Sequence, residues 1–206
     1  MAELPRLGIV RKARSQQFCE ARKYSLFVAP DFSQVAPRRV VIIPTGMEAG
    51  GFQAPFKFAE ILADSIRGCG LCEVFVPNSV DCRLNIDHLL AGQFEERDIS
   101  RLAHDYQCDA VLFLRVNSLK AFPPLQTSIT TALVDANESV VVFAMDGNWD
   151  INDREIRESF EQFNSVANPN QNESEFALQM RSPNRLFHFV AHQTTQAWQE
   201  AKSTGF

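Results

Sequence analysis

The sequence contains no run of about 18 consecutive apolar residues, the length that a membrane-spanning helix requires. The segment after Met1 also lacks the apolar core of a secretion signal. Cys19 is not interpreted as a lipidation site, because Gln16, Gln17 and Phe18 stand where small residues would be needed. We therefore expect either a cytoplasmic protein or an exported one whose signal has been removed. Any membrane contact would be made through an N-terminal anchor that this sequence does not contain.

An excess of positive charge is also missing. Lys and Arg number 20 against 25 Asp and Glu, which gives a formal net charge of -5. Basic residues occur only in short groups, and the group at Arg11, Lys12 and Arg14 is interpreted as a solvated N-terminal arm. A general nucleic-acid-binding surface needs a concentrated basic footprint. The composition therefore predicts no nucleic-acid partner.

Cysteines are few, and their number is odd: five in the whole chain. An odd count argues against a disulfide framework. Cys69-Gly-Leu-Cys72 has the spacing of a redox pair, but in such pairs the first cysteine opens a helix, whereas here a helix is predicted to end. If the protein is exported, Cys69 and Cys72, or Cys72 and Cys82, could form a structural disulfide. Otherwise these cysteines are free thiols, either buried or without a role. No further ligands stand at zinc-site spacing.

Catalytic motifs are lacking as well. There is no Gly-x-Ser-x-Gly nucleophile motif. Gly46 to Gly51 has the glycine spacing of a phosphate-binding loop, but Phe52-Gln53 replaces the required Lys-Ser/Thr, and Glu48 would repel a phosphate. This segment is interpreted as a flexible crossover loop. We predict no catalytic residue, no enzymatic activity and no cofactor.

Two groups of polar residues resemble ligand sites but have simpler explanations. His188 and His192 are four residues apart and share a helix face, yet no third metal ligand accompanies them, so they are placed on the polar side of that helix. The aspartates in the segment 146–153 do not match a calcium loop. Helix capping explains them, with Asp150 or Asn152 as the N-cap. No metal site is predicted.

Hydrophobic patterns predict an α/β protein. The apolar, β-branched run Arg39–Ile43 is typical of a strand buried on both faces, and amphipathic segments with i, i+3, i+4 spacing separate it from two further predicted strands. Strand–helix–strand connections imply parallel strands with right-handed crossovers. The predicted strands are Arg39–Ile43, Cys72–Val76 and Ala110–Leu119, and the predicted helices run from Pro55 to Gly68 and from Glu95 to Gln107.

The following segment predicts an antiparallel meander. Leu125–Leu133 alternates between apolar and polar residues, the period of a half-buried strand. A turn at Asp135–Glu138 leads into a returning strand, Ser139–Met145. The sheet is therefore mixed. One more short strand is expected at Tyr24–Val28, and two helices close the chain, the second beginning at Ser182-Pro183.

The corner between the last parallel strand and the meander reads Lys120-Ala-Phe-Pro-Pro124. Two prolines make it stiff. Phe122 could pack on the body of the domain, or it could form a rigid apolar knob for a partner, because a pre-organised contact loses less entropy on binding. Phe122, Pro123 and Pro124 are the candidate partner-binding residues.

The segment 38–150 resembles a family of small envelope domains. The family includes the curli secretion channel lipoprotein, the penicillin-binding-protein activator lipoprotein and the amino-terminal domain of TolB. The matching motifs are Val40-Val-Ile-Ile-Pro44, Cys108-Asp-Ala-Val-Leu112, Phe122-Pro-Pro124, Leu133-Val-Asp135 and Ala144-Met-Asp-Gly147.

This resemblance implies a fold similar to anticodon-binding domains and a non-catalytic, periplasm-facing accessory or lipoprotein-type protein, associated with the outer membrane. It would bind protein partners in assembly or secretion, and self-association is a further expectation. The expected organisation is an N-terminal extension (1–37), an α/β core domain (38–150) and a C-terminal helical extension (151–206) that packs on the core. The alternatives are a small nucleotide- or ligand-binding enzyme or sensor that uses the loop 45–54, and a cytoplasmic scaffold of similar fold.

Overall fold

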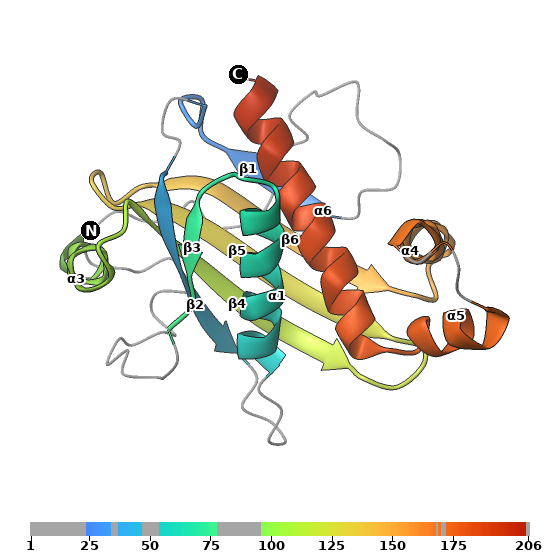
Figure 1. Ribbon diagram of the computed structural model, residues 1–206. Coiled ribbons are helices and arrows are strands. Elements are labelled where there is room, and N and C mark those ends of the chain that lie inside the picture. The colour runs from blue at the N-terminus through green and yellow to red at the C-terminus, as the bar shows by residue number, and fades with distance from the viewer. Residues whose placement is uncertain are drawn as a thin grey trace.

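A computed structural model describes residues 24–33, 37–46, 54–77, 96–167, 169 and 172–204. These residues form a six-stranded mixed sheet with helices on both faces (Figure 1). The strand order is β1-β6-β5-β4-β2-β3. The predicted fold class, a mixed α/β sheet flanked by helices, is confirmed. Among the described residues, no helix is long and apolar enough to cross a membrane.

The parallel half of the sheet comprises three strands, and its arrangement follows the prediction. Strand β2 pairs in parallel with β3 on one side and with β4 on the other. The Asp109 carboxylate accepts hydrogen bonds from the backbone N–H groups of Arg38 (2.9 Å) and Arg39 (3.1 Å), which ties the start of β2 to the start of β4. The bounds are β2 Arg39–Gly46, β3 Glu73–Phe75 and β4 Ala110–Lys120.

The antiparallel half continues from β4 through β5 and β6 to β1, so the predicted meander is confirmed. The register between β4 and β5 shifts between Val116 and Ser118, which leaves Asn117 as the extra residue of a bulge. The bounds are β5 Gln126–Asp135, β6 Val141–Asp150 and β1 Tyr24–Val28. Strand β1 therefore lies where the sequence predicted a strand, and it forms one edge of the sheet.

Two long helices cover one face of the sheet. In Figure 1, α1 (Ala54–Gly68) and α6 (Pro183–Thr204) lie side by side across it. The hydroxyls of Ser65 on α1 and Thr195 on α6 are hydrogen-bonded at 2.9 Å. Between these helices and the sheet lies the main core, to which Phe58, Phe143 and Trp198 contribute buried aromatic rings.

The opposite face is covered at one end only among the described residues. Helix α3 (Glu96–Tyr106) packs Ile99 and Leu102 against Val111, Phe113 and neighbouring strand residues in a second, smaller core. Strand β2 contributes alternate residues to both cores, which explains its continuous apolar sequence. Farther along, the outer faces of β4, β5 and β6 carry polar side chains.

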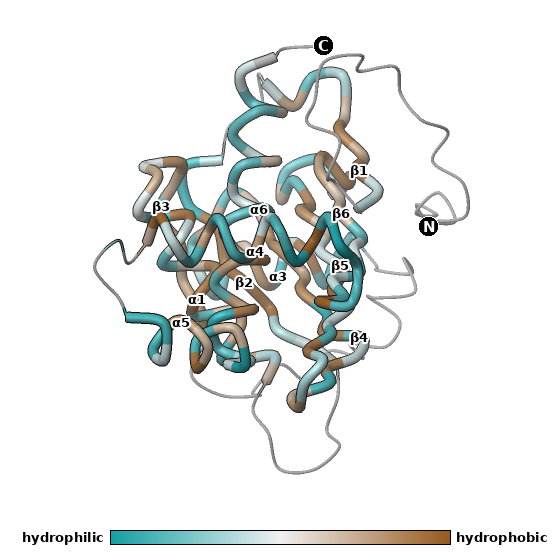
Figure 2. The backbone as a smooth tube through the Cα atoms, turned by 90° about the vertical axis from the view of Figure 1, so that its right-hand side faces the viewer, coloured by the Kyte–Doolittle hydropathy of each residue, from teal (hydrophilic) through white to brown (hydrophobic). Residues whose placement is uncertain are grey.

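The C-terminal region contains one more helix than the sequence predicted. After α4 (Arg154–Ala167), a short helix α5 (Glu173–Gln179) precedes α6. Its start is a capping box, in which the Asn172 side chain accepts from the Glu175 N–H and the Glu175 carboxylate accepts from the Asn172 N–H. This signal was present in the sequence. In Figure 2 most of α4 is coloured hydrophilic, as suits a helix with one exposed side.

The N-cap of α4 was predicted wrongly. The capping residue is Asp153, not Asp150 or Asn152, because its carboxylate accepts from the N–H groups of Glu155 (3.0 Å) and Ile156 (3.4 Å). Asp150 instead accepts from the N–H of Asn152 (2.8 Å) and stabilises the turn before the helix. The chain makes this extra turn before the helix begins, so the cap lies later than the composition suggested.

Residues outside the segment 38–150 contribute directly to the sheet and to its core. Strand β1 pairs with β6, and Phe32 packs on Phe143 (ring centroids 5.7 Å apart) and Trp198 (6.4 Å). The boundaries of the three predicted regions stay a prediction.

Candidate functional site

The corner between β4 and β5 holds the three predicted partner-binding residues. Both of its sides are anchored: Leu125 is buried and its carbonyl accepts from the N–H of Ile151 (3.0 Å), while the Thr127 hydroxyl donates to the Ser118 carbonyl (3.0 Å). Between these anchors, the Phe122 side chain is 79% exposed. It does not pack on the body of the described structure.

Phe122 belongs to a small group of exposed apolar side chains. It is the most exposed large hydrophobic residue among those described, followed by Val166 on α4 (75%) and Leu178 on α5 (69%). Phe75, by contrast, packs on Tyr106 with ring centroids 5.6 Å apart. Pro123 is exposed and Pro124 is half-buried beside it. The corner therefore presents an aromatic ring to solvent from a backbone that is held at both ends.

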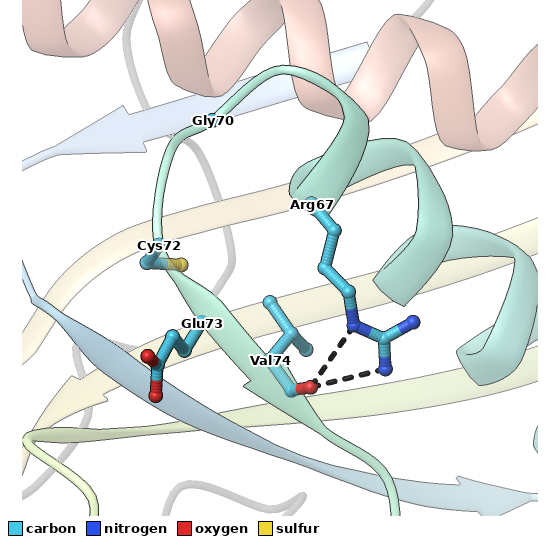
Figure 3. A pocket seen from close by; sticks show the side chains of 5 residues that line it. All are labelled: Arg67, Gly70, Cys72, Glu73 and Val74. Atoms are coloured by element: carbon cyan, nitrogen blue, oxygen red, sulfur yellow. Dashed lines mark hydrogen bonds between the residues drawn. The ribbon is translucent and has the colours of Figure 1, made fainter.

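A hollow at the end of α1 is lined by Arg67, Gly70, Cys72, Glu73 and Val74 (Figure 3). The Arg67 guanidinium is engaged, because Nε and Nη2 both donate to the Val74 carbonyl, at 3.2 and 3.0 Å. Burial raises the pKa of Cys72 to about 11. Its thiol is therefore neutral near pH 7 and a weak nucleophile. This hollow does not assemble an acid–base pair or an activated nucleophile.

Arg67 has a structural role at this place. Strand β3 is an edge of the sheet, and an edge strand with unpaired backbone groups can recruit other chains. Because Glu73 donates its N–H to Arg38 on the β2 side (2.8 Å), alternation turns the Val74 carbonyl outward, where Arg67 binds it. Because this outward-facing carbonyl is already hydrogen-bonded, the edge is less able to pair with a strand of another chain.

The cysteines of the predicted disulfide lie in and beyond the turn after α1. Gly70, with a φ of 65°, allows this turn. Cys69 is exposed and Cys72 is half-buried, and both are free thiols in the structure. Cys82 lies outside the described residues. The disulfide stays a prediction.

The remaining candidates do not converge on one place. His188 and His192 are on the exposed side of α6, as predicted, and no group of three potential metal ligands occurs among the described residues. The pKa of each histidine is lowered, and burial is the largest cause. The loop 47–53 lies outside the described residues, so the structure does not describe the glycine segment that the nucleotide alternative requires.

Sequence reasoning did not identify a polar surface on the sheet. The Asn117 side chain donates to the Thr130 hydroxyl (2.8 Å), which donates to the Asp146 carboxylate (2.8 Å). The chain of hydrogen bonds crosses three strands on the face that α1 and α6 do not cover. The alternation of residues along the sequence predicted that Gln126, Ser128 and Thr130 would share a face of the sheet. The pairing of β5 with β4 and with β6 decides which charged side chains of those two strands lie next to them.

Comparison with protein-family models gives no match, and no curated protein matches the sequence. Solved structures with a related chain trace include the PelC dodecamer from Paraburkholderia phytofirmans (14% identity, 61% of this chain and 78% of that chain, TM-score 0.43). They also include lipoprotein GNA1162 from Neisseria meningitidis (15%, 66% and 98%, 0.41) and the hypothetical protein CT253 from Chlamydia trachomatis (10%, 79% and 95%, 0.46). At these values the likeness does not extend to function. The resemblance to the envelope family stays a prediction.

Proposed function

We propose that this protein is a non-catalytic accessory domain of the cell envelope that binds a protein partner through the corner Lys120–Leu125. The observation that carries the proposal is the exposure of Phe122, 79%, on a corner that Leu125 and Thr127 hold in place. A corner whose backbone is already held in place loses less conformational entropy on binding than a flexible one. The resemblance of residues 38–150 to envelope domains supports the location.

The chemistry of the corner defines the partner. The corner offers an aromatic ring with prolines beside it, so the partner must supply an apolar pocket. Burying one Phe side chain contributes about 1.5–3 kcal/mol, which corresponds to roughly a ten- to hundredfold gain in affinity.

The test begins with the full-length protein in its source organism. A photo-crosslinking amino acid is placed at position 122, and at position 166 in a matched control, because Val166 is similarly exposed on α4. The protein captured only from position 122 is identified and purified. Its affinity for the wild-type chain and for the Phe122→Ser and Val166→Ser variants is then measured by titration calorimetry.

We expect Phe122→Ser to weaken binding roughly ten- to hundredfold and Val166→Ser to leave it unchanged. Equal affinity of the two variants, or equal crosslinking from both positions, contradicts the contact. Location is tested separately by fractionating cells and measuring the mass of the native N-terminus. A processed or acylated N-terminus in the envelope fraction supports the proposal, whereas an unprocessed protein in the cytosol contradicts its envelope part and favours the scaffold alternative.

A further inference from the structure

The outer face of β4, β5 and β6, beyond α3, carries its side chains in transverse rows. In the first row, Arg115 on β4 is the register partner of Thr130 on β5, which is the register partner of Asp146 on β6. Their neighbours along the strands, such as Val116 and Ile129, point into the main core under α6. Alternation therefore directs the row away from the helices. The row runs from a cation through a neutral residue to an anion.

The same order of charges returns two rows farther along the strands. Lys120, Gln126 and Asp150 form the third row, again from β4 through β5 to β6. The row between the two charged ones is uncharged and polar, and its members are Ser118, Ser128 and Asn148. Together these three rows are called the open face. Its β4 side is positive, and its β6 side is negative.

The charges of the first and third rows are not neutralised within their own rows. Neither Arg115 nor Lys120 forms an ion pair with another described residue, and both are exposed. Arg115 and Asp146 are two strands apart, about 10 Å between backbones. Asp146 is nevertheless held in position, because Thr130 donates to its carboxylate and Asn117 donates to Thr130. The face thus displays charges of opposite sign on opposite sides, and its Asp146 carboxylate is held in place by hydrogen bonds.

Two copies can pack with their open faces together, related by a two-fold axis that is parallel to β5 and lies between the two sheets. This axis places β4 of each copy opposite β6 of the other. It also leaves each residue at the same position along the strand direction. Arg115 of each copy then faces Asp146 of the other, and Lys120 of each faces Asp150 of the other. Charged rows therefore meet in complementary pairs, and the neutral rows meet each other. We propose that the open face is the interface of a symmetric dimer of this chain.

The strand directions are compatible with known sheet packing for the part of the face beyond α3, which covers the other end of this face in each copy. An axis parallel to the strands leaves the strands of both copies running in the same direction, and aligned sheets pack with their strands about 30° apart. A symmetric dimer uses the same patch twice, so each complementary pair occurs twice. Any other partner would have to carry the reversed charge order at the same spacing, whereas a second copy provides it by symmetry.

The interface is polar, so the dimer should be weak and sensitive to salt. Exposed charges are screened over about 10 Å at 0.1 M ionic strength. We expect the dissociation constant, measured by sedimentation velocity on the full-length chain, to rise about tenfold or more between about 50 mM and 500 mM salt.

Charge exchange gives the deciding experiment. Arg115→Asp places a carboxylate opposite Asp146 twice in the dimer, and Asp146→Arg places a guanidinium opposite Arg115 twice. Each variant alone should be monomeric in low salt. An equal mixture of the two should form a heterodimer, because each new charge then meets its opposite across the axis. The doubly substituted chain, R115D with D146R, should dimerise by itself.

The control is Lys57→Asp, the same charge change on α1 at the opposite face of the sheet, which should dimerise like the wild-type chain. Circular dichroism checks that every variant is folded. A wild-type chain that stays monomeric in low salt overturns the proposal, as does a mixture of the two single variants that fails to associate. Phe122→Ser lies outside the three rows and should leave the dimer intact, so loss of partner binding and loss of the dimer are distinguishable.

Discussion

The indole Nε1 of Trp149 donates a hydrogen bond of 2.6 Å to the side-chain oxygen of Gln193. This bond joins β6 to α6, and two other helices, α4 and α5, lie between these elements in the sequence. The indole ring is buried and lies over Gly147 on the same strand. The glycine of the motif Ala144-Met-Asp-Gly147 therefore has a physical role, which is to leave room for a tryptophan.

Gly147→Ala should destabilise the protein. A Cβ atom at position 147 would lie 2.4 Å from Cη2 of Trp149, and the hydrogen bond to Gln193 restrains the ring from moving. We expect a loss of about 1–3 kcal/mol in the free energy of unfolding, measured in urea. Gly68→Ala is the control, because nothing lies within 4 Å of its Cβ position and it ends α1. Equal stability of the two variants would show that the ring adapts.

Gln193→Leu should leave the indole N–H of Trp149 buried without an acceptor. We expect a loss of about 1–3 kcal/mol in the free energy of unfolding. Gln193→Glu keeps an acceptor and should lose less. Gln196→Leu, an exposed position on the same helix, serves as the control and should change stability by less than about 0.5 kcal/mol. A Gln193→Leu variant as stable as this control would mean that the bond contributes nothing.

Phe122 should matter little for folding, in contrast to a core phenylalanine. We expect Phe122→Ala to change the free energy of unfolding by less than about 0.5 kcal/mol. Phe160→Ala should lose about 3–5 kcal/mol, because that ring is buried and packs on Phe189 at 5.4 Å. Paired chemical denaturation measures both. A large loss for Phe122→Ala would show that the corner contributes to the core.

Stability should fall as the pH falls below about 6.5, the ordinary histidine pKa. Burial lowers the pKa of both His188 and His192, and Arg185 and Lys57 lower that of His188 further, against the opposite effect of Asp64. Below about pH 6.5 the unfolded chain therefore binds more protons than the folded one. The contribution of the two neutral histidines to the free energy of unfolding is fully present above their pKa in the unfolded chain, and it is lost as the pH falls through their lower pKa values in the folded chain.

We expect the melting temperature to drop less between pH 7.5 and about 5 in the double variant His188→Gln, His192→Gln than in the wild-type chain. Gln196→Asn, at an exposed position on the same helix that carries no titratable group, is the control and should reproduce the wild-type slope. Identical slopes for all three proteins would assign the acid sensitivity to other groups.

The fragment 38–150 should not fold cooperatively by itself. It lacks Phe32, which packs on Phe143, and α6, which covers the main core with Leu186, Phe187 and Val190. Circular dichroism and urea denaturation of the fragment, beside the full-length chain, check this. A cooperative transition in the fragment would support the segment 38–150 as a domain that folds without its extensions.

Local sequence signals predicted most elements of the fold. The β-branched run at Val40–Ile43 indicated a strand buried on both faces, and alternation in Leu125–Leu133 indicated a half-buried one, because both patterns depend only on the geometry of a strand. Ser182-Pro183 correctly indicated the start of α6, where the Ser182 hydroxyl accepts from the N–H of Arg185 (3.4 Å). Helix α5 was missed, although its capping box is local.

For the candidate site, the sequence indicated a stiff corner with Phe122 but left two alternatives for the ring. Packing on the body depends on the atoms that surround the corner, and only the folded chain shows that Phe122 is exposed. The histidine pair was placed correctly on an exposed helix face, because helical periodicity decides that relation without tertiary contacts.

Sequence alone determined the strands and most of the helices, the parallel and antiparallel connections and the exposed faces, since these follow from spacing along the chain. The tertiary structure decided which segments meet: β1 beside β6, Trp149 beside Gln193, and Arg115 in one row with Thr130 and Asp146. These relations join residues that are far apart in the sequence, and burial and hydrogen bonding across the whole sheet select them. No local pattern carries that information.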